Sequence, residues 1–345
     1  MDKASRLEKM LPNGKGLWIP IDHGLSDYPN PGLEDTEALI RELVEAKVDV
    51  IVAQKGLVDY FSHLCQGTQT SMVIHLSAST RHGGDDASRK VLVGNPSEIL
   101  TRGGIGASAQ VNMGTTGEAE MLEALGKVTT ESHLIGLPVL GMVYARGSNL
   151  NPVPGDKTQG VSQAARVAFE MGCDVAKTTW TGDSESFKHV TSAAPIPMLV
   201  AGGANTGDTR SVLLMVEKAM KAGASGVCMG RQVFAHKSPG KMAMALRRII
   251  HEGIASTVAA DELIFEVQTW KSGSIRILRP HMTVLIFISQ KRTQRPLFLQ
   301  KKDFFTKEIH RLALMSISIQ TNVSNMLVRL QELWIGFILR SKIGQ

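Results

Sequence analysis

The chain has 345 residues, 43% of them hydrophobic, with a mean hydropathy close to zero, which excludes an intrinsically disordered protein and allows two domains or one large α/β barrel. The formal net charge of +6 comes from the C-terminal part, because residues 264–345 hold 13 of the 38 basic residues but only 4 of the 32 acidic ones. Residues 1–263 are therefore mildly acidic, which argues against a nucleic-acid-binding body and predicts two parts, 1–263 and 264–345.

The cysteines and the N-terminus indicate the cellular compartment. Cys65, Cys173 and Cys228 lie far apart and form no CxxC pair, so neither a disulfide framework nor a cysteine zinc site is expected. The N-terminus is charged from Asp2 onward, and the charge-free hydrophobic stretch at 282–290 is shorter than the ~20 residues that span a bilayer. The sequence predicts a cytoplasmic protein without a membrane helix.

Short apolar segments alternate with longer amphipathic ones along residues 1–263, a pattern typical of βαβ units. Strands are predicted at residues 16–22, 48–54, 71–78, 107–114, 138–145, 174–180, 197–203 and 226–234. Apolar spacings of three and four residues predict helices in the connections, for example at 33–46, 163–171 and 210–222.

Local signals support several helix ends. Asn95, Pro96 and Glu98 form a capping sequence for a helix start, and Gly172 and Gly223 fall where helix C-caps are expected. Eight strands, each followed by a helix, predict an α/β fold, the (β/α)8 TIM barrel. The alternative is an open doubly wound sheet, which would need a GxGxxG turn after its first strand, where this chain has the sequence DHGL.

In a TIM barrel the reactive groups lie at the C-terminal ends of the strands, and five of the predicted strands carry polar or glycine residues there. These residues are Asp22 and His23, Tyr144 and Arg146, Lys177, Gly202 and Gly203, and Gly230 and Arg231. We expect them to gather at one site.

Lys177 interrupts a β-branched strand that is expected to be buried on both faces. A buried ammonium is costly unless its pKa falls, and a neutral amine is the form that attacks a ketone to make a Schiff base. The structural alternatives are a lysine that reaches solvent from the strand edge, or one paired with Asp22.

Asp22 and Tyr144 are expected to face the same cavity. Schiff-base aldol chemistry needs one group that moves protons during carbinolamine dehydration and another that deprotonates the substrate hydroxyl when the carbon–carbon bond breaks. A carboxylate and a phenol suit these two tasks. A helix cap is the structural alternative for Asp22, and a core tyrosine with a satisfied hydroxyl is the alternative for Tyr144.

The glycine turns after the seventh and eighth strands, with Gly202, Gly203 and Gly230, predict a phosphate site, to which Arg231 adds a fixed charge. A plain tight turn is the alternative for each glycine pair. The histidines show no HExxH-like spacing, so no metal or other cofactor is expected.

Five segments carry a resemblance to the archaeal-type class I aldolases, the DhnA/FbaB type. They are residues 19–26 (IPIDHGLS), 75–80 (HLSAST), 111–114 (VNMG), 144–147 (YARG) and 176–183 (AKTTWTGD). The resemblance covers roughly three-quarters of the chain. It implies a metal-free Schiff-base mechanism with Lys177 as nucleophile and with Asp22 and Tyr144 in acid–base roles.

The resemblance also implies a transaldolase that moves a hydroxyacetone unit from 6-deoxy-5-ketofructose 1-phosphate to L-aspartate semialdehyde, in a route to aromatic amino acids. Gly202, Gly203, Gly230 and Arg231 would hold the donor phosphate, and His23 and Arg146 are added to the substrate-binding set. Fructose-bisphosphate aldolases and autoinducer-2 phosphate thiolases share these motifs and remain alternatives. Related enzymes are homo-oligomers, often decamers, so assembly is expected.

Three features depart from the family pattern and put the substrate in doubt: Trp180 in place of a smaller aromatic residue, Ala145 in place of a proline, and the polar loop 81–90. The segment 264–345 is not typical of the family. It contains a basic cluster at 291–302 and an apolar stretch at 326–339 that predicts a short helix. An accessory or oligomerisation arm is one interpretation, and an addition without selected structure is the one we favour.

Two other functions are weighed against the aldolase. One is a nucleic-acid-binding protein that uses its basic tail, which predicts salt-sensitive binding lost on truncation after Leu263. The other is a different phosphosugar enzyme, an isomerase or metal-dependent aldolase, which predicts activity sensitive to chelators. We expect phosphorylated ketose and aldehyde substrates, with neither nucleic acid nor membrane as a partner.

Overall fold

The computed structural model describes residues 1–287, apart from 152, 204–207, 265, 270–273 and 280–281. Residues 204 and 205 of the predicted phosphate turn, the basic cluster at 291–302 and the predicted helix at 326–339 lie outside the described residues.

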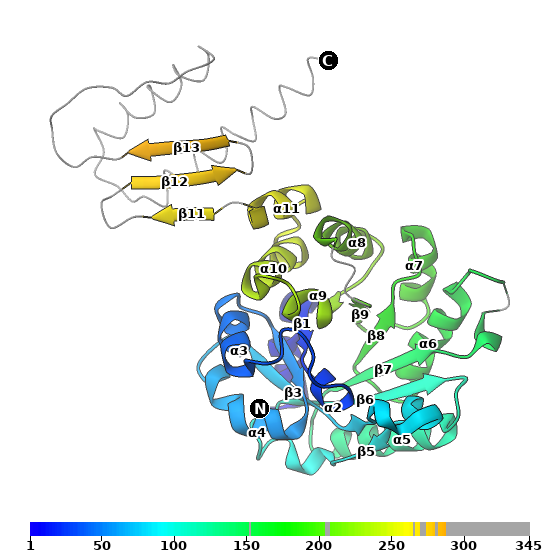
Figure 1. Cartoon of the computed structure of the whole chain (residues 1–345). Coiled ribbons are helices and arrows are strands. Elements are labelled where there is room, and N and C mark those ends of the chain that lie inside the picture. The colour runs from blue at the N-terminus through cyan, green and yellow to red at the C-terminus, as the bar shows by residue number, and fades with distance from the viewer. Residues whose placement is uncertain (152, 204–207, 265, 270–273, 280–281, 288–345) are drawn as a thin grey trace. The chain divides into compact units, whose positions relative to one another are not determined.

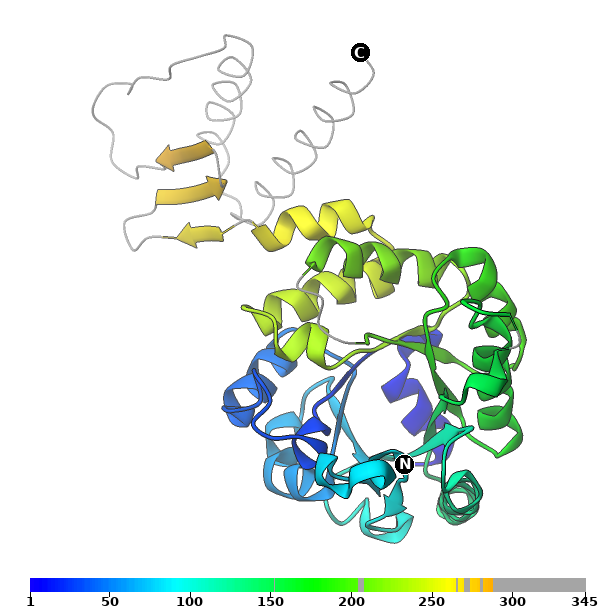
Figure 2. The ribbon, with the colours of Figure 1, turned by 45° about the vertical axis from the view of Figure 1, so that its right-hand side comes forward.

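Eight parallel strands close into a barrel, in the order β1-β10-β9-β8-β7-β6-β3-β2. Figures 1 and 2 show the strands at the centre with helices around them. The strands are β1 (Gly16–Pro20), β2 (Val50–Ala53), β3 (Ser71–His75), β6 (Gly106–Met113), β7 (Val139–Ala145), β8 (Val175–Thr179), β9 (Met198–Ala201) and β10 (Gly226–Cys228). The predicted TIM barrel is confirmed, and the open sheet is wrong because β10 pairs with β1.

Helices follow seven of the eight strands. They are α2 (His23–Ser26), α3 (Thr36–Glu45), α4 (Lys55–Phe61), α5 (Glu118–Leu134), α6 (Thr158–Glu170), α7 (Ser184–Ser192), α8 (Thr209–Lys221), α9 (Arg231–Phe234), α10 (Pro239–Arg247) and α11 (Ser256–Ile264). The connection from β3 to β6 contains instead an antiparallel pair, β4 (Ser77–Ala78) and β5 (Val91–Leu92), and 3-10 turns. The expectation that every connection is an α-helix is therefore wrong there.

Seven of the eight predicted strands end earlier than expected, and one predicted helix cap begins a different kind of element. The strand predicted at 16–22 ends at Pro20, and the one predicted at 226–234 ends at Cys228 and continues as helix α9. Apolar residues of a short buried helix resemble a buried strand, because both are uniformly apolar. The capping box of Asn95 and Glu98 is present, but it begins a 3-10 turn, Pro96–Glu98. Gly172 and Gly223 have the left-handed backbone expected of C-caps, with φ of 82° and 97°.

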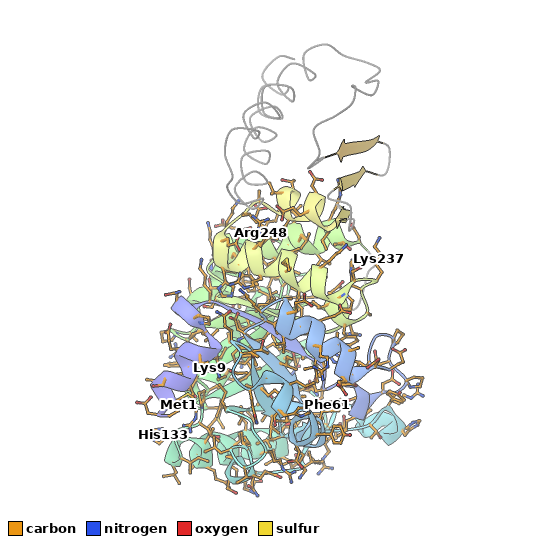
Figure 3. All side chains as sticks on the ribbon, turned by 90° about the vertical axis from the view of Figure 1, so that its left-hand side faces the viewer. Met1, Lys9, Phe61, His133, Lys237 and Arg248 are labelled. Atoms are coloured by element: carbon orange, nitrogen blue, oxygen red, sulfur yellow. The ribbon has the colours of Figure 1, made fainter. Side chains whose placement is uncertain are left out.

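The core has two layers, one inside the barrel and one between the strands and their helices. Helix α1 (Lys3–Met10) closes the end of the barrel where the strands begin. The Trp18 indole donates a hydrogen bond to the Met10 carbonyl at 2.9 Å, and Arg6 donates to the Gly136 carbonyl at 2.7 Å. Figure 3 labels Met1 and Lys9 on either end of this helix and His133 near the end of α5. The opposite end of the barrel, where the strands end, is therefore the end that can hold a site.

A separate three-stranded sheet follows α11. Its strands are β11 (Glu266–Thr269), β12 (Ser274–Arg279) and β13 (Met282–Phe287), and β11 pairs with β12 in antiparallel register. The division of the chain between residues 263 and 264 stays a prediction.

Candidate active site

Lys177 is the third residue of β8, and its side chain lies inside the barrel. The strand is buried along almost its whole length, and Lys177 is 8% exposed. Because side chains alternate along a strand, Lys177 shares the face of Val175, which packs in the interior of the barrel. A lysine that reaches solvent from the strand edge is therefore excluded.

Tyr144 reaches Lys177 from the neighbouring strand. Met142 is the register partner of Lys177 in the pairing of β7 with β8, and Tyr144 stands two residues nearer to the C-terminal end. The two side chains are close enough that each shifts the pKa of the other. The Arg146 guanidinium lies 4.8 Å from the centroid of the Tyr144 ring. Tyr144 therefore lies between the lysine and a fixed cation.

Asp22 precedes helix α2 at the N-cap position, but its carboxylate makes no capping hydrogen bond. Its Oδ1 atom lies 3.3 Å from Nδ1 of His23, and its Oδ2 atom lies 3.8 Å from Nε2 of His75. Lys177 is a further electrostatic neighbour. The carboxylate faces the interior of the site, so the helix-cap interpretation does not describe it.

The charges around Lys177 decide its protonation state. The pKa of the lysine is lowered by burial, but Cys228, Tyr144 and Asp22 outweigh burial and raise it above the ordinary value. Burial raises the pKa of the Tyr144 phenol and raises that of the Cys228 thiol to about 11, so both stay protonated at neutral pH. Because neither of these two groups is then charged, Asp22 is the one anion among the three at neutral pH, and the neutral amine expected from the sequence stays a prediction.

The pKa of Asp22 is correspondingly low. Burial raises it, but the neighbouring imidazoles and the Lys177 ammonium outweigh burial, and the pKa ends below its ordinary value. The imidazole of His75 is itself held neutral, since burial lowers its pKa to about 4 against the opposing effect of Asp22. Near neutral pH, His75 therefore adds no charge beside Asp22.

Three residues outside the predicted catalytic and binding set lie at this site. His75 ends β3, is 3% exposed and hydrogen-bonds through Nδ1 to the Ser108 hydroxyl at 2.7 Å. Cys228 is a buried thiol and an electrostatic neighbour of Lys177. Lys90, from the connection between β3 and β6, is an electrostatic neighbour of Asp22. Their signal in the sequence is weak: a cysteine in an apolar strand is normally inert, and Lys90 lies in a polar loop.

His23 and Gly230 meet beside Asp22. Burial lowers the pKa of His23, and its ring makes an edge contact with Phe234, with centroids 5.1 Å apart. A Cβ atom on Gly230 would lie 2.6 Å from Cε1 of His23 and 2.4 Å from the Pro20 carbonyl oxygen, so only glycine fits. Arg231 is exposed and acts electrostatically on His23.

The other predicted glycine turn follows β9. The Gly202 carbonyl accepts a hydrogen bond from the Gln232 side chain at 3.2 Å, which joins this turn to helix α9. Gly203 has a left-handed backbone, with φ of 67°, and a Cβ atom there would meet nothing within 4 Å. The two glycine turns therefore lie together, and Gly203 borders open space.

The described residues contain no group of three His, Cys, Asp or Glu side chains that could hold a metal ion. In the same part of the chain, no helix is both long and apolar enough to cross a membrane.

Comparisons with known proteins agree on one group of enzymes. The model of the DeoC/LacD family aldolases matches residues 17–236. The chain is 35% identical over 250 residues to 2-amino-3,7-dideoxy-D-threo-hept-6-ulosonate synthase of Halobacterium salinarum, covering 72% of this chain and 92% of that protein. It is also 35% identical over 233 residues to 2-amino-4,5-dihydroxy-6-oxo-7-(phosphonooxy)heptanoate synthase of Streptomyces griseus, covering 68% of this chain and 84% of that one.

A solved structure gives the same answer for the fold. The structure of a Schiff-base-forming fructose-1,6-bisphosphate aldolase superposes with a TM-score of 0.65 at 25% sequence identity. The match covers 72% of this chain and 100% of that chain.

Proposed function

This chain belongs to the DeoC/LacD family of aldolases, and we propose that it is a Schiff-base transaldolase that joins a hydroxyacetone unit to L-aspartate semialdehyde. The family resemblance predicted from the motifs is confirmed. The observation that carries the proposal is the buried Lys177 with Tyr144 and Asp22 as its electrostatic neighbours. The product would be the one named for the Halobacterium relative, 2-amino-3,7-dideoxy-D-threo-hept-6-ulosonate.

The relatives' names support this choice of reactants. Both name a 2-amino acid of seven carbons with a ketone at carbon 6. An aldol disconnection of such a β-hydroxyketone between carbons 4 and 5 gives a 2-amino-4-oxo acid, which is aspartate semialdehyde, and a three-carbon ketone. In the 7-deoxy product that ketone is hydroxyacetone. We propose 6-deoxy-5-ketofructose 1-phosphate as its donor and a place in aromatic amino acid synthesis, as the sequence resemblance implies.

Imine formation begins at Lys177. The neutral amine of Lys177 attacks the ketone carbon, and the neighbouring Asp22 carboxylate takes the proton that the nitrogen releases, which gives a carbinolamine. Tyr144, whose raised pKa keeps its proton, donates that proton to the departing hydroxyl, which leaves as water and gives the iminium.

The carbon–carbon bond breaks next. The lowered pKa of Asp22 keeps it ionised, so Asp22 can take the proton of the substrate hydroxyl once it has passed the one from Lys177 to solvent. The bonding electrons move toward the iminium nitrogen, which gives an enamine on Lys177 and a free aldehyde. The enamine carbon attacks the incoming aldehyde, the new alkoxide takes a proton back, and water hydrolyses the imine. We propose that Gly202, Gly203, Gly230 and Arg231 hold the substrate phosphate, with His23 and Arg146 also in contact with substrate.

The alternative is a class I fructose-bisphosphate aldolase. It is supported by the superposition with a Schiff-base-forming aldolase of that name. Its chemistry would use the same lysine, carboxylate and phenol, with glyceraldehyde 3-phosphate in place of aspartate semialdehyde.

Borohydride reduction tests the shared chemistry. With a ketose phosphate present, we expect a mass adduct on Lys177 that is absent in Lys177→Met and present in Lys221→Met, which removes an exposed lysine. An adduct that survives in Lys177→Met would overturn the Schiff-base assignment. Product analysis with 6-deoxy-5-ketofructose 1-phosphate then separates the two functions, because only the transaldolase yields the amino-acid product when aspartate semialdehyde is added.

We further propose a cytoplasmic homo-oligomer. The three cysteines are free and buried in the barrel, which suits a reducing compartment. Light scattering on the purified chain measures the number of subunits. We expect an oligomer of up to ten subunits.

A further inference from the structure

A serine and a histidine that the mechanism does not use connect two neighbouring strands to Asp22. His75 is the last residue of β3, and Ser108 is its register partner on β6. The two residues are 3% and 0% exposed. Nδ1 of His75 lies 2.7 Å from the Ser108 hydroxyl oxygen, and Nε2 lies 3.8 Å from Oδ2 of Asp22. The imidazole therefore stands between a buried hydroxyl and the carboxylate.

The hydrogen-bonding needs of these groups select one tautomer of His75. In the described part of the chain, the Ser108 hydroxyl has no hydrogen-bond partner other than Nδ1. A buried O–H group without an acceptor is destabilising, so the serine donates to Nδ1. The proton of the neutral imidazole then stands on Nε2, the nitrogen that faces the carboxylate. The other tautomer would turn a lone pair toward an anion and leave the serine proton without an acceptor.

Asp22 has few other groups that could fix its carboxylate. It makes no capping hydrogen bond to the helix that follows it. Nδ1 of His23 lies 3.3 Å from Oδ1, but this nitrogen makes no hydrogen bond among the described residues. The 3.8 Å between His75 and Oδ2 is longer than a hydrogen bond, and such contacts commonly shorten when a substrate binds. The Nε2–H group is thus the donor that can hold Asp22 on its Oδ2 side.

We propose that Ser108 and His75 are positioning residues for Asp22. Ser108 fixes the imidazole in the Nε2–H tautomer, and the imidazole holds the carboxylate in the orientation that a base needs. This inference rests on the proposed aldolase chemistry and adds to it the groups that orient its base. Neither residue gives or takes a proton in the reaction.

A double-mutant cycle tests whether Ser108 acts through Asp22. The readout is the rate at which borohydride traps the imine on Lys177. In Ser108→Ala we expect this rate to fall about tenfold, the effect of one hydrogen bond. In the Asp22→Asn background the same substitution should have no further effect, because the base that Ser108 positions is gone. Ser108→Thr keeps the hydroxyl and should recover most of the loss.

Ser132→Ala is the matched control. It removes another fully buried serine hydroxyl, which lies on α5 and has no hydrogen-bond partner among the described residues. Its trapping rate should equal that of the wild type. An equal loss from Ser108→Ala in both backgrounds, or no loss in either, would overturn the proposal in favour of a purely structural role for Ser108.

The tautomer is measured on the wild-type protein. Solid-state nitrogen NMR on the histidine-labelled chain distinguishes protonated from unprotonated ring nitrogens, and His75→Gln identifies the signals of His75. At neutral pH we expect a protonated Nε2 and an unprotonated Nδ1. A proton on Nδ1 would overturn the proposal. This measurement needs no substrate, whereas the borohydride adduct of the wild type tests the proposed function, so failure of either is recognised separately.

Discussion

Tyr144 lies beside Lys177, on the neighbouring strand inside the barrel, and each side chain shifts the pKa of the other. This pairing places a phenol that keeps its proton next to an amine that must lose one when it attacks a ketone. The two groups have different partners on their other sides: Arg146 covers the phenol ring, and Asp22 faces the amine. The arrangement gives the lysine one neighbour that can donate a proton and one that can accept one.

Replacing Tyr144 with phenylalanine should remove the proton donor while leaving the ring under Arg146. Loss of a general acid typically costs about 100-fold or more in kcat. Because borohydride reduces the imine and not the carbinolamine, the yield of reduced adduct should fall at short reaction times. Tyr60→Phe, which changes an exposed tyrosine, should behave as wild type. An undiminished kcat in Tyr144→Phe would mean that another group donates the proton.

Asp22 gives a prediction for pH. Its lowered pKa keeps it a carboxylate at neutral pH, so it stays available to take the proton that the Lys177 nitrogen releases on attack. The rate of imine trapping in the wild type should therefore change little between about pH 6 and 8. In Asp22→Asn this internal base is gone, so trapping should be slower and should rise with pH as the amine deprotonates. Asp59→Asn, outside the barrel beside Arg102, is the control, and an equal pH dependence in both variants would refute the role of Asp22.

His75 should make the folded state less stable in acid. Its pKa of about 4 lies below the ordinary 6.5, so the unfolded chain binds the proton more readily. The contribution is fully present above pH 6.5 and is lost as the pH falls toward 4, by about 3 kcal/mol from the conversion of the pKa difference. Thermal unfolding between pH 7 and 4 should show a weaker pH dependence in His75→Gln than in the wild type. His189→Gln, at an exposed position on α7, should keep the wild-type slope.

Sequence patterns predicted the barrel because eight apolar segments recur with helical connections between most of them. They also identified the strand-end residues, since the C-terminal ends of parallel strands meet at one end of a barrel. Helix α9 was missed because it is four residues long and buried, which a strand of the same composition would match. The hairpin of β4 and β5 was missed because two-residue strands have no period to detect.

The electrostatic surroundings of Lys177 could not be predicted from the sequence, for a different reason. A residue's own strand indicates its burial, but Asp22 and Cys228 come from strands far away in the chain. Their electrostatic effect depends on distances that only the closed barrel defines. The same is true of Lys90, whose relation to Asp22 is visible only once the hairpin has folded.

Gly203 tests the predicted phosphate turn. Inorganic phosphate should raise the melting temperature of the wild type, because a ligand that binds only the folded state stabilises it. In Gly203→Ala the added methyl group would project into the open space beside the turn, and the phosphate-dependent rise should be lost. Gly155→Ala has a similar left-handed backbone, with φ of 84° and nothing within 4 Å, so it carries the same backbone strain and should keep the rise. Equal responses of the two variants to phosphate would exclude Gly203 from the binding site.

Truncation after Leu263 tests the predicted two-part chain. Residues 1–263 contain 25 basic and 28 acidic residues, so the truncated chain should elute from a polyanion column at much lower salt than the full chain. Every group proposed to take part in the chemistry lies before residue 264, and we therefore expect the borohydride adduct on Lys177 to form as readily in the truncated chain as in the full one. Equal retention of the two chains on the column would show that the basic tail does not govern polyanion binding. Loss of the adduct together with a lower melting temperature would show instead that the C-terminal part stabilises the barrel, and the boundary near residue 263 would then be wrong.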